Sequence, residues 1–268
     1  MSLGQIFTAG SPAIVPALSP LTAWNLPHLV HGFMTRGGGA SQGLYCSFNL
    51  AEGVGDDPNA VSSNWARWRS AYPRVHLARL QQVHGNRVHS IGVAYDGSTR
   101  IGDGMVTGER GIVLAIFTAD CVPVLMIDAD AGIVGALHAG WRGTLAGIAG
   151  EGVSAMVALG ARSRRICAAL GPSIGSCCFE VDAELADRFT SRIPPAAAYC
   201  RAGRPGKKHL DLRGIVRAQL RGAGVTAGSV VDIGPCTRCN SGRFFSRRAA
   251  DGAATGLQMS FIGLEPEQ

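Results

Sequence analysis

Five short runs of apolar and β-branched residues follow one another in the middle of the chain, and most of the links between them are too short to hold a helix. Gly, Asp and Pro residues separate the runs, as is typical of strands joined by turns. Parallel neighbours need a crossover of about a dozen residues or more. The pattern therefore predicts a mixed sheet with helices outside it rather than a doubly wound nucleotide-binding fold. The runs cover residues 76–83, 87–93, 112–117, 122–127 and 133–137.

Other segments complete this α/β prediction. Residues 29–34 and 166–170 are expected to form buried strands. A helix is expected to start at Pro58, because Asp57 can cap its free N–H groups and proline suits the first helical position. Two more helices are expected, at 143–159 and 211–221.

The chain is expected to fold as one domain. Its 268 residues, 46% of them hydrophobic, can bury a sizeable core, and single α/β domains often reach this length. Prolines at positions 12, 16 and 20 interrupt the beginning of the chain, which predicts a tail over residues 1–25 and a single catalytic domain over 26–268.

The charge of the chain limits its partners. A formal net charge of +6 suits an anionic ligand such as phosphate or a nucleotide. The arginine-rich stretches 162–165 and 201–208 lack interleaved aromatic residues for base stacking, which argues against nucleic acid. The chain does not start like a signal peptide and has no long apolar run that would span a membrane, so a cytoplasmic protein is expected. Its eight cysteines should then be reduced.

Three residues suggest a metal centre. His84, Cys121 and His138 each lie near the end of an expected strand, and they are too far apart in the sequence to be a zinc finger. Two imidazoles and a thiolate are a ligand set for catalytic zinc, which keeps a fourth position open. Taken singly, each could instead be a hydrogen-bonded histidine or a small buried cysteine.

Two other chemistries are alternatives to a zinc centre. Cys121 and His138 could form a metal-free nucleophilic pair with Asp120 orienting the imidazole, but His84 would then have no function. A multicopper oxidase needs about ten imidazoles, since copper prefers nitrogen ligands, and this chain has seven histidines. Zinc is therefore expected as the cofactor, ahead of copper.

The motifs around these residues resemble one enzyme family. The chain is similar to the purine nucleoside phosphorylases formerly described as polyphenol oxidase or laccase-domain proteins, over residues 28–263. The motifs that carry the resemblance are His31-Gly32-Phe33, Thr35-Arg36-Gly37-Gly38, Asn49-Leu50, Val54-Gly55-Asp56-Asp57-Pro58, Gln82-Val83-His84-Gly85, Thr118-Ala119-Asp120-Cys121-Val122-Pro123-Val124-Leu125, His138-Ala139-Gly140-Trp141-Arg142-Gly143, Gly171-Pro172-Ser173-Ile174 and Phe244-Phe245-Ser246.

The resemblance implies a fold, a metal and an activity. The fold would be a single-domain, three-layer α/β/β sandwich related to the catalytic domain of cytotoxic necrotizing factor. Zinc would be bound by the positions matched by His84, Cys121 and His138, which would be catalytic. The family cleaves adenosine, inosine, guanosine and methylthioadenosine with phosphate and deaminates adenosine, so purine nucleosides and phosphate are the expected partners of what we expect to be a monomer. Some bacterial members are described as peptidoglycan editing factors, which leaves a binding protein for acidic muropeptide precursors as an alternative.

Substrate contacts are assigned by residue chemistry. Arg36 and Arg142 can each offer two parallel donors to phosphate. Asn49 and Asp103 could bind ribose or base edges, or could be turn residues. The chain also departs from the family pattern, which has Phe-Phe-Ser-Tyr-Arg-Arg-Asp and then Thr-Gly-Arg near the C-terminus. Here the tyrosine is missing and Leu257 replaces the last arginine, while Arg247 is a further candidate.

Four other cysteines carry less information. Cys236 and Cys239 form one C-x-x-C motif, which could be half of a metal site or a redox pair. The sequence has no second C-x-x-C, so reduced structural thiols are predicted. Cys177 and Cys178 stand beside Phe179 and are predicted to belong to the core.

Overall fold

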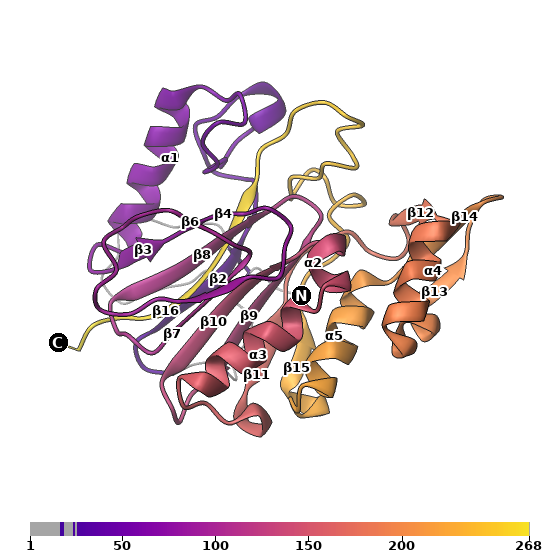
Figure 1. Ribbon diagram of the computed structural model, residues 1–268. Helices are drawn as coiled ribbons and strands as arrows, with labels where there is room; N and C mark the ends of the chain where they lie inside the picture. Colours follow the sequence, from indigo (N-terminus) through magenta and orange to yellow (C-terminus); the bar gives the residue numbers. More distant parts are fainter. Residues whose placement is uncertain (1–16, 19–23, 25, 268) are drawn as a thin grey trace.

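Two mixed sheets pack face to face in this protein, with helices on their outer faces (Figure 1). The structure is a computed structural model and describes residues 17–18, 24 and 26–267. The first sheet has five strands, in the spatial order β1 (Ala17–Leu18), β2 (Leu29–Met34), β16 (Gln258–Leu264), β8 (Ile112–Thr118) and β3 (His76–Ala78).

The second sheet has six strands. Only its two edge pairs are parallel, β15 with β11 and β5 with β7, and the central pairs are antiparallel. This mixture confirms the prediction from the short links. The spatial order is β15 (Val230–Asp232), β11 (Cys167–Leu170), β9 (Val122–Asp128), β10 (Ile133–Ala139), β7 (Gly104–Thr107) and β5 (Val88–Ser90).

The central strands are apolar on both faces because both faces are covered. On β9, Val124 and Met126 pack under the helices, whereas Leu125 and Ile127 pack between the sheets. On β8 the alternate residues face the interior between the sheets and the helix on the other side. Continuous apolar runs are therefore the expected sequence of these strands.

The helices lie on both outer faces. Helices α2 (Trp141–Leu145), α3 (Ile148–Ala158) and α5 (Leu212–Gly222) cover the six-stranded sheet, while α1 (Pro58–Ala71) covers the five-stranded one. The side chain of Asp57 caps α1 by accepting a hydrogen bond from the N–H of Asn59 at 2.9 Å. The α/β/β layers are thus present, and α1 adds a helix on the far side that the three-layer prediction did not include.

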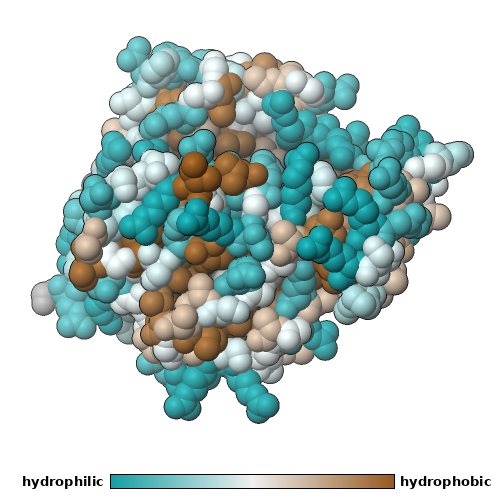
Figure 2. All heavy atoms as spheres, viewed as in Figure 1, coloured by the Kyte–Doolittle hydropathy of each residue, from teal (hydrophilic) through white to brown (hydrophobic). Residues whose placement is uncertain are grey.

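Smaller elements complete the fold. A three-stranded sheet projects from one end of the molecule together with α4 (Figure 1). On the face shown in Figure 2, apolar residues gather over the centre and hydrophilic ones lie around them. The remaining elements are β12 (Glu180–Asp182), β14 (Lys207–Leu210), β13 (Cys200–Ala202), α4 (Ala183–Arg192), the pair β4 (Leu80–Gln81) and β6 (Arg100–Ile101), and the 3₁₀ turns Gly43–Tyr45, Ser163–Arg165, Pro194–Tyr199 and Ala227–Ser229.

Several predicted boundaries differ from the structure. The strand predicted at 76–83 is divided into β3 and β4. The helix predicted at 143–159 is two helices, because Gly147 between them has a φ of +89° and leaves the helical conformation. The strands β7 and β16 and the small projecting sheet were not predicted.

Most of the tail predicted at 1–25 lies outside the described residues. The described parts contact the domain: residues 17–18 pair with β2, and Trp24 is buried between the sheets. Among the described residues, no helix has both the length and the apolar character that crossing a bilayer requires.

Candidate active site

Cys121 lies in the tight turn between β8 and β9. Asp120, which precedes it, has a φ of +92°, a left-handed conformation that costs energy for a residue other than glycine. Three hydrogen bonds hold Asp120 there: its carboxylate accepts from the Thr237 hydroxyl at 2.5 Å and from the N–H of Arg248 at 2.7 Å, and its carbonyl accepts from Ile174 at 2.8 Å. The turn therefore presents Cys121 in one defined position.

His138 is near the end of β10, and Asp103 orients its ring. The two are buried, and His138 Nδ1 lies 2.8 Å from Asp103 Oδ1. Burial opposes the charge of Asp103, but the His138 ring and the N–H groups of Gly85 and His84 hold its pKa below the ordinary value. An ionised carboxylate only accepts hydrogen bonds, so Nδ1 carries the proton and Nε2 is directed toward Cys121 and His84.

His84 belongs to the loop after β4, which Asp103 and Gln82 hold in place. Asp103 accepts hydrogen bonds from the N–H groups of His84 at 2.8 Å and Gly85 at 2.7 Å. Gln82 forms two hydrogen bonds of 2.8 Å with the backbone of Phe117 on β8. One buried carboxylate therefore positions both histidines.

These three residues come together as the sequence predicted. One ligand atom from each of His84, Cys121 and His138 lies within 4.8 Å of the other two. The pairing of β9 with β10 places Val122 opposite Ala139. The start of β9, next to Cys121, therefore lies beside the end of β10, which contains His138. Imidazole nitrogen and thiolate sulfur are ligands for transition metals, so the group fits a metal ion.

Electrostatic coupling favours the ligating form of the thiol. Burial raises the pKa of Cys121, but the two neighbouring histidines outweigh burial and lower it to about 6. Burial lowers the pKa of His138, but the Cys121 thiolate and Asp103 raise it to about 9. A metal ion that binds here replaces the His138 proton as the positive charge facing the thiolate.

The three residues form part of the wall of a cavity of about 630 Å³. This volume is in the range of small-molecule sites. Apolar side chains supply much of the rest of the wall, as is typical of small-molecule sites. They include Leu50, Val54, Leu80, Phe117 and Leu257.

The predicted arginines occupy different places. Arg247 lines the cavity, and its guanidinium donates to the carbonyl of Ala253 at 3.0 Å. Arg36 is half-buried outside the cavity, where it donates to the carbonyls of Cys46 and Ser241 and lies over a phenylalanine ring. Arg142 is exposed and stacks on Trp141, also outside the cavity lining. Phosphate contact by Arg36 and Arg142 stays a prediction.

Asn49 and Asp103 are buried beneath the site rather than in its lining. The amide of Asn49 accepts hydrogen bonds from the N–H groups of Ala51 and Leu257 and donates to Asp56, so it connects two wall segments. Substrate contact by these two residues also stays a prediction, and their hydrogen bonds here are to the protein itself.

Two wall residues, Arg79 and Thr118, were not singled out from the sequence, and a third, Leu257, was noted there only as a departure from the family pattern. Arg79 is paired with Glu52 at 3.3 Å. Thr118, at the end of β8, has a buried hydroxyl with no hydrogen-bond partner among the described residues. Leu257 lies in the wall at the position where the family pattern has arginine. Thr118 belongs to the motif Thr118-Ala119-Asp120-Cys121, so the sequence offered a signal for it. Arg79 belongs to none of the motifs, so the sequence offered no signal for that residue.

Gly140 provides a test of how closely the ligands pack. A Cβ atom on Gly140 would lie 2.9 Å from His84 Cδ2 and 3.1 Å from Cys121 Sγ, although its φ of −73° suits alanine. We expect Gly140→Ala to displace the ligands and weaken metal binding by about tenfold or more, measured by chelator competition. Gly150→Ala is the matched control, because a Cβ there meets nothing within 4 Å, and unchanged affinity in both variants would contradict the packing described.

Comparisons with known proteins agree with the geometry. The model of the multi-copper polyphenol oxidoreductase laccase family matches residues 30–265. A purine nucleoside phosphorylase of Deinococcus radiodurans is 41% identical over 252 residues, which cover 93% of this chain and 94% of that protein. Adenosine deaminase RL5, from an unknown prokaryotic organism, is 39% identical over 227 residues, 80% of this chain and 86% of that protein.

A solved structure extends the likeness to the whole fold. The crystal structure of YlmD from Geobacillus stearothermophilus aligns with a TM-score of 0.84 and 34% identity, over 98% of this chain and 99% of that one. The family model, the identities and the shared fold cover the same residues as the motifs. The chain therefore belongs to the multi-copper polyphenol oxidoreductase laccase family, together with relatives named purine nucleoside phosphorylase, as the resemblance of its motifs predicted.

Proposed function

We propose that this protein cleaves purine nucleosides with phosphate at a zinc ion bound by His84, Cys121 and His138, and that it deaminates adenosine at the same centre. The observation that carries the proposal is the convergence of these three ligands on the wall of the cavity of about 630 Å³. Relatives named purine nucleoside phosphorylase and adenosine deaminase, at 41% and 39% identity, support the two reactions.

The donor set favours zinc over copper. One thiolate and two imidazoles match zinc enzymes that keep a coordination position for a reactant, and seven histidines are too few for a multicopper oxidase. Bound zinc supplies a Lewis acid and lowers the pKa of a water ligand toward 7. Asp103 contributes by holding His138 with Nε2 free for the metal.

The cavity wall supplies the substrate contacts. Leu80, Phe117 and Leu257 offer apolar surface for the purine. Arg247 and Arg79 are the cationic side chains of the lining, and we assign phosphate binding to them. When the purine packs against these apolar side chains, they exclude water from the glycosidic bond.

A single chromatographic assay tests the reaction class. Purified protein is incubated with adenosine, with and without inorganic phosphate. We expect phosphate-dependent adenine and ribose 1-phosphate, and inosine independent of phosphate. Absence of all three products would contradict the proposal and favour a binding protein for acidic muropeptide precursors. Turnover that survives removal of all metal would instead favour the metal-free Cys121 and His138 pair.

Phosphate binding by Arg247 has its own test. We expect Arg247→Met to raise the KM for phosphate by about tenfold or more, because a charge-assisted hydrogen bond is lost, while the KM for the nucleoside changes little. Initial rates at varied phosphate measure the effect, and Arg221→Met, at an exposed position on α5, is the matched control. If Arg142→Met raises the phosphate KM and Arg247→Met does not, the assignment is wrong.

A further inference from the structure

Four cysteines that the sequence analysis left without a common role gather at one point behind the active-site turn. Cys177 and Cys178 follow β11, and Cys236 and Cys239 follow β15. Their four Sγ atoms lie within 4.8 Å of one another. The expectation that Cys177 belongs to the core was wrong, because its side chain is exposed and only Cys178 is buried. Cys177 and Cys178 therefore add two sulfurs to those of the C-x-x-C motif, although they are adjacent in the sequence and form no second C-x-x-C.

The sulfur separations match a tetrahedral metal site. All four are free thiols, and Cys239 Sγ lies 3.3 Å from Cys178 Sγ and 3.7 Å from Cys177 Sγ. In a zinc site with four thiolates, a Zn–S bond of about 2.3 Å places the sulfurs about 3.8 Å apart. The cluster therefore needs only small side-chain movements to bind a metal.

Backbone N–H groups are directed at one sulfur of the cluster. The N–H groups of Cys239 and Gly175 are hydrogen-bonded to the Cys236 sulfur. Backbone N–H donors to metal-bound sulfur orient the ligand and balance its charge. Gly175 permits the approach, since a Cβ there would lie 3.1 Å from Cys236 Cβ and 3.2 Å from Cys177 Sγ.

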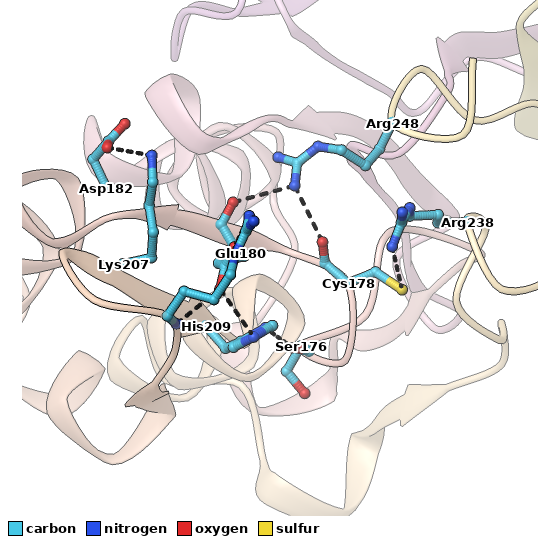
Figure 3. Close-up of polar contacts among 9 residues, drawn as sticks. Ser176, Cys178, Glu180, Asp182, Lys207, His209, Arg238 and Arg248 are labelled. Carbon is cyan, nitrogen blue, oxygen red and sulfur yellow. Dashed lines mark hydrogen bonds and ion pairs between the residues drawn. The ribbon is translucent and has the colours of Figure 1, made fainter. Parts of the chain in front are cut away.

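Arginine side chains lie beside the cluster. Figure 3 shows the guanidinium of Arg238 pointing at Cys178, with Nη1 3.7 Å from Sγ, and that of Arg248 pointing at the carbonyls of Cys178 and Glu180, both at 3.1 Å. Arg213 lies close to Gly175 and donates to the carbonyl of Gly234. Four thiolates with one divalent ion carry two net negative charges, and the contact of Arg238 with Cys178 Sγ offsets part of this charge.

We propose that Cys177, Cys178, Cys236 and Cys239 bind a structural zinc ion, separate from the one at His84, Cys121 and His138. Four sulfur ligands leave no position for a reactant, which is the pattern of a structural site. The zinc ion joins the loop after β11 to the loop after β15, where the backbone already forms a bridge between Ser173 and Cys236.

This second ion also supports the catalytic centre. Thr237 stands between two of the ligands, and its hydroxyl donates to Asp120 Oδ1 while its N–H donates to the carbonyl of Ser173 at 3.0 Å. Asp120 is the residue whose left-handed backbone sets the turn of Cys121. The four-cysteine site thus holds the loop against which that turn rests.

Zinc stoichiometry of the purified protein tests the proposal. We expect two zinc ions per chain in the unmodified protein, one in Cys121→Ala and one in the double variant Cys236→Ser/Cys239→Ser, by elemental analysis. The double variant should also show a fall in Tm of about 5 °C or more, since a structural metal ion stabilises the folded state that binds it. Cys200→Ala, outside both clusters, is the control and should keep both ions.

A second measurement uses the unmodified protein, so it does not depend on whether a variant folds. Iodoacetamide is added to zinc-loaded protein and the modified cysteines are mapped by mass spectrometry. The exposed Cys46 should react rapidly, while the equally exposed Cys177 and Cys239 should be protected until a chelator is added.

One zinc ion per chain that only Cys121→Ala removes, or reaction of Cys177 and Cys239 as fast as Cys46, would overturn the proposal. A disulfide among the four in protein purified with zinc would do the same. None of these measurements involves nucleoside turnover, so their outcome is independent of the proposed catalytic activity.

Discussion

Replacing Cys121 with alanine is expected to abolish turnover of purine nucleosides while leaving the protein folded. The thiolate is the only anionic ligand of the proposed catalytic zinc, and a bound metal supplies several kcal/mol of transition-state stabilisation. We therefore expect kcat/KM to fall by about 10³-fold or more. Steady-state kinetics measures the loss, and circular dichroism checks the fold.

His84→Ala separates the zinc mechanism from a metal-free thiol mechanism. Zinc requires His84, so this variant should lose the same zinc ion and a similar share of activity as Cys121→Ala. A nucleophilic pair of Cys121 and His138 has no use for His84. An active His84→Ala protein beside an inactive Cys121→Ala protein would therefore contradict the zinc mechanism and support the thiol one.

Asp103→Asn is expected to produce the second largest effect, on both metal affinity and stability. The carboxylate accepts hydrogen bonds from the His138 ring and from the N–H groups of His84 and Gly85. An amide nitrogen in its place would face one of these donors. We expect a 10- to 100-fold loss of zinc affinity, measured by chelator competition. We also expect a loss of about 3–5 kcal/mol of unfolding free energy, measured by denaturant titration.

Asp128→Asn is the matched control for that variant. Asp128 is also fully buried, at the far end of β9, and accepts hydrogen bonds from Arg162 and Arg165. The Asp128→Asn variant should have a lower free energy of unfolding and an unchanged zinc affinity. If both variants lose zinc equally, the effect of Asp103 on the metal comes from general destabilisation and its positioning role is wrong.

The same carboxylate adds a pH dependence with a defined sign. The folded-state pKa of Asp103 is below its ordinary value of 3.8. Its contribution to stability is therefore fully present above the unfolded-state pKa and is lost as the pH falls through the lower folded-state pKa. Below that range, stability curves of Asp103→Asn and the unmodified protein should converge.

Local patterns were enough to predict most of the central elements. The apolar runs of β8, β9 and β10 and the cap at Asp57 depend on neighbours in the sequence, so these three strands, strand 29–34 and the start of α1 were predicted correctly. The missed strands are different. Strand β7 is only four residues long and is buried because β10 pairs with it, and β16 is defined by partners at the other end of the chain.

The active site shows the same division. The residue types His, Cys and His near strand ends were visible in the sequence, and the chemistry of these ligands identified them as a group. Which arginines line the cavity was not visible in the sequence, because Arg36, Arg142 and Arg247 have the same side chain and nothing marked Arg79. Which of them lines the cavity depends on how the segment around Arg247 returns to β8 and β9.

The amino-acid sequence by itself determined the mixed α/β class and the family and grouped His84, Cys121 and His138 as candidate metal ligands, because these depend on periodicity, motif and donor chemistry. Only the tertiary structure decided that Asp103 orients both histidines, that Arg247 borders the cavity and that Cys177 and Cys178 meet Cys236 and Cys239. Each of these contacts joins residues on different strands or loops. Their distance in space is set by sheet register and by the crossing of two loops, which no local pattern encodes.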